Sequence, residues 1–289
     1  MKFKLNGLEK FLIRHKFPII IITACIFLIV VYSLVFNGLI LVALISIPIY
    51  WLVSRLLVNV SMIKNNQILK IRNSHLDLNE ALNATNQLID IINIKDFQSL
   101  AVLCNNRIAF LIEMGEFQKA ESEIRIFWQS FNIKKILSPT LVAIHTNMAA
   151  IALEKRDLKT YEEQFRLVCH YNQKITNKVM KRHSDFAISN LTQNAESVVA
   201  NENSNAESYT ARVWQTTRTD SLKGKILSDD EITPHSYLTV YEKLFNFSKN
   251  KGDLEKTKAY AEHIVNIANE QFYIYRKAKE YLENANRSN

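Results

Sequence analysis

Apolar residues are distributed unevenly along this chain, and one stretch stands apart from the rest. Residues 17–54 contain no Asp, Glu, Lys or Arg over 38 positions. A single straight helix of that length would measure about 57 Å, nearly twice the hydrocarbon core of a membrane. The run must therefore fold back, and Asn37-Gly38 at its middle favours a tight turn because both residues tolerate positive φ. The pattern predicts a transmembrane hairpin with spans at about 17–36 and 39–57.

Basic residues flank this run on both sides, whereas the expected turn between the spans carries no charge. Positive flanks stay on the cytoplasmic side of a membrane. We therefore expect a plasma (inner) membrane protein with two spans and with both termini in the cytoplasm. The lead, residues 1–16, is basic and amphipathic and should lie on the inner membrane surface. A cleaved signal peptide is the main alternative, but its apolar region would be shorter and no A-x-A-like cleavage site follows the first span.

Beyond the hairpin, apolar residues recur at the spacing of amphipathic helices, and residues that break helices are scarce. The whole chain of 289 residues holds five Gly and four Pro. The pattern predicts an all-α protein in three parts. Residues 1–59 form the basic lead and hairpin, 60–95 a helical linker, and 96–289 a cytoplasmic helical domain that ends in a capping helix at about 271–282.

Three segments of the last part share one plan, in which a helix of about 17 residues meets a tight turn and a second helix starts with an acid. Gly115 and Gly252 suit the left-handed residue that ends a helix, and Arg156 stands at the same place in the middle segment. Ser138-Pro139 and Thr233-Pro234 are typical helix openers, because the hydroxyl caps an amide and proline fits the first turn. Residues 172–232 leave room for one further, degraded pair of helices.

This plan resembles the tetratricopeptide repeat (TPR), a helix-turn-helix unit of about 34 residues. The resemblance covers about residues 96–283 and rests on the turns around Gly115 and Gly252, with small residues Ala120 and Thr257 after them. The chain departs from the family at Arg156 and Tyr161 and in its longer spacing between turns. A TPR-like α-solenoid is thus expected, with a generic antiparallel helical bundle as the alternative.

The resemblance implies a binding scaffold whose first helices line a groove for a protein or peptide partner. Ala109 and Ala150 stand where the family's chaperone-tail clamp would need asparagine, so that ligand is not expected. The residues that the resemblance places in the groove are Asn105, Ala109, Ile112, Thr146, Ala150, Leu153, Glu242, Asn246 and Lys249.

Composition and motifs narrow the possible functions further. The net charge is +8, but residues 1–59 carry +5 of it, and the remaining +3 is too little for a nucleic-acid surface. The three cysteines form no disulfide framework. Cys169 and His170 are adjacent on a helix and diverge by about 100°, so they do not chelate a metal. His145 and His263 are more typical of ordinary helix positions than of catalytic bases.

No catalytic, cofactor or metal motif is evident, so we expect no enzyme activity, no cofactor and no small-molecule substrate. The favoured hypothesis is a non-enzymatic, membrane-anchored scaffold of a bacterial inner membrane, whose partners are a protein or peptide and the lipid bilayer. The alternative is an accessory subunit of an integral membrane complex, such as a transporter, recruited through the hairpin. An enzyme with an unfamiliar site is a third possibility.

Overall fold

The computed structural model describes residues 2–220 and 223–287, apart from the side chains of residues 56–58, and over this part of the chain the all-α prediction is confirmed. One isolated antiparallel bridge joins Thr219 and Ile226. The helices are α1 (Gly7–Arg14), α2 (Lys16–Phe36), α3 (Ile40–His75), α4 (Leu78–Ile91), α5 (Phe97–Glu113), α6 (Phe117–Ser130), α7 (Ser138–Glu154), α8 (Leu158–Gln173), α9 (Lys178–Val199), α10 (Ala206–Thr217), α11 (Pro234–Lys251), α12 (Leu254–Ile267) and α13 (Tyr273–Arg287), with short helical turns η1 (Ile133–Lys135) and η2 (Asp229–Glu231).

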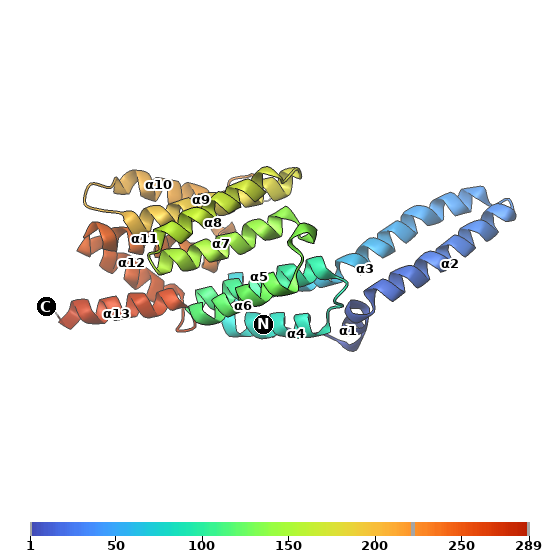
Figure 1. The fold of residues 1–289 in the computed structure, drawn as a ribbon, viewed down its shortest axis with the longest axis horizontal. Coiled ribbons are helices and arrows are strands. Elements are labelled where there is room, and N and C mark those ends of the chain that lie inside the picture. The colour runs from blue at the N-terminus through green and yellow to red at the C-terminus, as the bar shows by residue number, and fades with distance from the viewer. Residues whose placement is uncertain (1, 221–222, 288–289) are drawn as a thin grey trace.

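Helix α2 and the first part of α3 form an arm that projects from a body made by the second part of α3 and the remaining helices (Figure 1). They run antiparallel, and the rings of Phe27 and Tyr50 stack across the pair with centroids 4.3 Å apart. At the tip, Gly38 has a φ of +75° and the Leu39 amide donates to the Leu34 carbonyl oxygen at 2.8 Å. The tight turn predicted at Asn37-Gly38 is present, because glycine reaches this left-handed conformation without strain.

One helix of the arm, α2, is by itself long and apolar enough to cross a membrane, and none of the residues of its apolar stretch is buried within the protein. Helix α3 is long and apolar enough to cross a membrane only when its two parts, Ile40–Arg55 and Asn59–His75, are taken together across a bend of 44°. The second apolar segment therefore does not end near residue 57 as a separate helix. It continues as the first inner helix of the body.

The body is a ring of helix pairs. Helices α3, α5, α7, α9 and α11 each contact the next, and α11 returns to contact α3. These five are the inner helices, and each packs against the helix that follows it in the chain, so that α4, α6, α8, α10 and α12 are the outer helices. The pair α9 and α10 occupies most of the segment 172–232. Helix α13 packs against α12 and follows it at the C-terminal end of the body (Figure 1).

Three turns between inner and outer helices have the same backbone geometry. Gly115, Arg156 and Gly252 have φ values of +72°, +56° and +84°. In each turn the amide of the following acid donates to a carbonyl oxygen five residues earlier, at 2.8–3.0 Å. This hydrogen bond is the signature of the Schellman cap. Asp157 and Asp253 then cap α8 and α12 by accepting from the amides of Thr160 and Lys256.

The segment 60–95 is part of the body rather than a linker that carries the body away from the arm. Its buried residues Ile68, Ile71 and Leu88 belong to one apolar core with Phe245 and Phe272 near the other end of the chain. An amphipathic face of this length must be covered by another element, and here α11–α13 cover it.

The basic lead also packs against the body, through one of its faces. Phe3 and Ile13 join the same core, and the Phe3 amide donates to Glu80 Oε1 on α4 at 2.6 Å. Leu8 and Phe11 are exposed on the other face. Only part of the expected amphipathic surface is therefore left to contact lipid.

Candidate functional site: a cavity inside the helical ring

A cavity of about 330 Å³ lies inside the ring and is lined by residues from all five inner helices, together with Phe117 and the start of α13. The ring explains the cavity, because each inner helix presents one stripe of side chains toward a common centre. On α5 and α7 those stripes include Ala109 and Ala150, whose small side chains leave space unfilled. A concave site with mixed apolar and polar walls is the usual setting for ligand binding.

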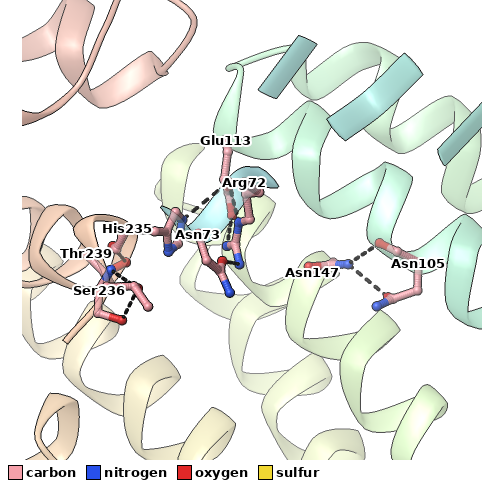
Figure 2. A network of polar contacts seen from close by, with 9 residues as sticks. Arg72, Asn73, Asn105, Glu113, Asn147, His235, Ser236 and Thr239 are labelled. Carbon is pink, nitrogen blue, oxygen red and sulfur yellow. Dashed lines mark hydrogen bonds and ion pairs between the residues drawn. The ribbon is translucent and has the colours of Figure 1, made fainter. Parts of the chain in front are cut away.

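The structure brings most of the predicted groove residues together at this cavity. Seven of the nine line it: Ala109, Ile112, Thr146, Ala150, Leu153, Glu242 and Asn246. Asn105 lies just outside it and accepts, through Oδ1, a hydrogen bond of 2.9 Å from Nδ2 of the lining residue Asn147 (Figure 2). Lys249 is exposed and its ammonium lies 5.8 Å from the Phe245 ring centroid, away from the lining. That these residues bind a partner stays a prediction.

A polar network at the wall of the cavity was not predicted from the sequence. Glu113 on α5 lies between Arg72 on α3 and His235 on α11 (Figure 2). Arg72 Nε donates to Glu113 Oε2 at 3.0 Å, a second contact joins Arg72 Nη2 to Oε1, and His235 Nε2 lies 3.5 Å from Oε2. The network ties three helices that are far apart in the chain.

The charges of this network follow from its surroundings. Burial alone would raise the pKa of Glu113, but Arg72 and His235 beside it lower that pKa to about 2. Burial, with the nearby guanidinium of Arg72, lowers the pKa of His235 below its usual value despite the opposing effect of Glu113. At neutral pH the network is therefore an Arg–Glu ion pair with a neutral imidazole.

Glu242 on α11 has a different environment. Among the described residues no hydrogen bond or ion pair is made by its carboxyl group. Burial and the like charge of Glu154 raise the pKa of Glu242 to about 7, against the opposing effects of Lys277 and Lys243. Lys277 pairs with Glu154 at 3.2 Å. Lys243 turns toward α9, where its ammonium contacts Gln193 Oε1 at 2.8 Å.

The lining thus contains one carboxyl group whose charge is not balanced by a direct partner. Glu113 is matched by Arg72, and Glu154 by Lys277, which leaves Glu242 as the group able to meet an incoming cation or hydrogen-bond donor. A ligand that pairs with Glu242 would favour its ionised form. This arrangement can hold a polar or cationic side chain inside an otherwise largely apolar wall.

The histidines singled out from the sequence lie elsewhere. His145 is buried between the rings of Trp128 and Tyr171, and its Nδ1 hydrogen-bonds to Gln164 Oε1 at 2.8 Å. His263 stacks on Tyr241. Over the described part of the chain, no group of three or more His, Cys, Asp or Glu is arranged to hold a metal ion.

The chain was compared with protein-family models, with curated protein sequences and with solved structures, and none of the three comparisons gave a match. The site is therefore interpreted from its own geometry and charges.

Proposed function

We propose that this chain is a membrane-anchored scaffold, without enzymatic activity, whose TPR-like helical body binds a protein or peptide partner at the cavity inside the ring. The observation that carries the proposal is the convergence of the residues assigned to a binding groove on one cavity. A cavity of about 330 Å³ suits one or two anchor side chains of a partner rather than a whole folded element.

The arm supports the anchoring part of this proposal. Large apolar side chains cover its outer surface, including Ile21, Leu28 and Ile29 on α2 and Leu41 and Leu44 on α3. Contiguous exposed apolar surface of this extent marks a membrane or protein interface. We propose that α2 and the first half of α3 both cross the membrane and that both termini lie in the cytoplasm, as the basic flanks indicate.

The alternative, an accessory subunit recruited through the arm, needs small residues on the outside of the arm for close helix packing. Ala43 is only 3% exposed and is buried within the arm, and the Thr23 hydroxyl donates to the Ile19 carbonyl oxygen of its own helix at 2.9 Å. These two small residues are thus used inside the hairpin. Ser33 remains on the exposed surface, so this alternative is kept as an outcome of the test.

The test is photo-crosslinking in cells with the full-length protein. A photo-reactive residue replaces Ile112, which lines the cavity, or as a control Lys119, which is exposed on the outer helix α6. We expect Ile112, and not Lys119, to crosslink to a defined protein, and the crosslink to survive replacement of the arm by an unrelated transmembrane hairpin. An A150W substitution, which fills the cavity, should abolish the crosslink.

A different outcome would overturn the scaffold proposal. Crosslinks that form only from arm positions to another membrane protein, and that disappear on replacing the arm, would identify an accessory subunit. Crosslinking from Ile112 that persists in an A150W variant of unchanged helicity would show that the partner does not occupy the cavity.

A further inference from the structure

A second pocket, separate from the ring, lies between the start of α5 and the end of α6 and has a volume of about 640 Å³. Its walls are mostly apolar and aromatic. The rings of Phe97 and Phe131 lie with their centroids 6.1 Å apart, and the centroids of the Phe127 and Phe131 rings are 4.7 Å apart. The apolar wall residues are Ile89, Phe97, Leu100, Ile126, Phe127 and Phe131.

This pocket lies at the base of the arm. The loop between α4 and α5 forms one side of its mouth, and Asn93 in that loop donates to the Arg14 carbonyl oxygen at 3.3 Å. Asp96 in the same loop pairs with Lys16, the first residue of α2. Figure 1 shows α1 near the end of α4, where the arm leaves the body. If α2 crosses a membrane, the pocket therefore opens beside the lipid headgroups.

The mouth of the pocket combines basic and apolar groups. Lys95 and Lys135 line it and are exposed, and next to them Ile94 is 81% exposed and Leu137 59%. The Gln98 amide holds the two sides together, because it donates to the Lys135 carbonyl oxygen and accepts from the Leu137 amide. Deeper in the pocket, the other two charged residues, Arg107 and Glu123, pair with each other.

The lining therefore has an apolar interior and a mouth with two positive charges, neither of which is paired with an acid among the described residues. A molecule that fits it has an apolar chain and an anionic head. Lysines close to a membrane surface favour anionic lipids, and burial of methylene groups among apolar side chains is favourable for each group buried. Exposed isoleucine and leucine beside the lysines match the boundary between headgroups and acyl chains.

We propose that this pocket binds an anionic phospholipid of the membrane that holds the arm, with an acyl chain among Phe97, Leu100 and Phe127 and the phosphate beside Lys95 and Lys135. The proposal rests on the proposed insertion of α2. It adds a lipid-selective contact between body and membrane that the arm alone does not supply.

The experiment uses the full-length protein in nanodiscs of phosphatidylcholine, alone or with phosphatidylglycerol. Cys104 lines the pocket, and in a C25S/C169S background it is the single thiol, so its alkylation reports occupancy. Burial raises the pKa of Cys104, so labelling is done at alkaline pH. We expect phosphatidylglycerol to slow alkylation, and K95Q/K135Q to reduce the phosphatidylglycerol that co-purifies with the protein about tenfold. The control K134Q/K119Q removes two exposed lysines outside the pocket and should behave as wild type.

Two results would overturn the proposal. One is alkylation of Cys104 at the same rate in both lipid mixtures, together with unchanged lipid retention by K95Q/K135Q. The other is equal loss of lipid in K95Q/K135Q and K134Q/K119Q, which would indicate a diffuse surface charge effect. Resistance of the wild type to alkaline extraction from membranes is measured in parallel. Release of the wild-type protein by alkaline extraction would refute insertion of the arm. If the protein stays in the membrane but alkylation of Cys104 does not depend on the lipid, only the pocket proposal is refuted.

Discussion

Lys16 and Asp96 form a buried ion pair where the arm joins the body. The Lys16 ammonium lies 2.6 Å from Asp96 Oδ2, and the two side chains are only 8% and 10% exposed. The Ser61 hydroxyl on α3 lies 3.4 Å from the same carboxylate oxygen. The pair thus links the first residue of α2 to α3 and to the loop before α5, and it fixes the direction in which the arm leaves.

Removing one partner of this pair should be strongly destabilising, because an uncompensated charge would remain buried. We expect D96A to lower the free energy of unfolding of the body by about 3–5 kcal/mol. Chemical denaturation followed by circular dichroism measures this change. The double variant K16M/D96L, which removes both charges, should recover most of the loss. A K16M/D96L protein as unstable as D96A would show that packing, not charge, dominates at this site.

The turns at Gly115 and Gly252 should differ in their tolerance of a side chain. A Cβ at Gly252 meets no atom within 4 Å, whereas a Cβ at Gly115 would lie 2.7 Å from Cδ2 of Tyr273. Both positions have positive φ, so G252A should cost about 1–2 kcal/mol from backbone conformation alone. G115A should cost more, because Tyr273 must move as well. Thermal denaturation compares the two, and in a Y273A background the difference between them should shrink.

Arg156 adopts the same left-handed conformation without being glycine, so its replacement should be stabilising. R156G removes the steric cost at φ of +56° and loses only an exposed contact of 3.5 Å to Asn250. The gain is partly offset by the greater freedom of glycine in the unfolded chain. We expect a net increase of about 0.5–1 kcal/mol in unfolding free energy. The matched control R166G, on the exposed face of α8, should be destabilising.

Glu242 should make the stability of the protein depend on pH near neutrality. Its pKa is raised to about 7 in the folded state. Between the unfolded value and pH 7 the folded protein retains a proton that the unfolded chain releases, so stability falls as the pH rises through this window. E242Q removes the penalty and should be more stable than wild type by about 1–3 kcal/mol above pH 7, with little difference at acidic pH. Equal pH profiles for both proteins would contradict this assignment.

Glu113 should show the opposite dependence. Its folded-state pKa is lowered to about 2, so its contribution is present at neutral pH and is lost as the pH falls toward 2. E113Q leaves the Arg72 guanidinium without its anionic partner and should cost about 2–3 kcal/mol at neutral pH. The free energy of unfolding, measured as a function of pH, should therefore be lower for E113Q than for wild type near neutrality. The two curves should converge as the pH falls toward 2.

Local features of the fold were predictable because they depend on local chemistry. The left-handed conformation of Gly115 and Gly252 follows from glycine. Arg156, which departs from the glycine pattern in the sequence, adopts the same conformation. The turn of the arm at Asn37-Gly38 follows from the same preference. Seven residues of the cavity lining were among the nine that the repeat resemblance placed in a groove, whereas the rest of the lining was not predicted.

The features missed depend on contacts between distant parts of the chain. The role of residues 60–95 in the core depends on α11–α13, and the Arg72–Glu113–His235 network joins three separated helices. Lys16 and Lys243 are buried, although lysine in a helical pattern normally indicates an exposed position. Sequence periodicity reports which face of a helix is apolar, and it does not identify which helix covers that face.

Closure of the ring also constrains the order in which the chain can fold during its synthesis. The apolar face of α3 near Ile68 and Ile71 is covered by Phe245 and other residues of α11–α13, which leave the ribosome after α3–α10. Until then the nascent protein carries an unsealed apolar seam beside an arm that has already been made. The added entropy of joining such distant segments is small, since each doubling of the intervening length costs only about 0.6 kcal/mol. Folding of the body is therefore delayed rather than opposed, and it is completed when α11 closes the ring onto α3.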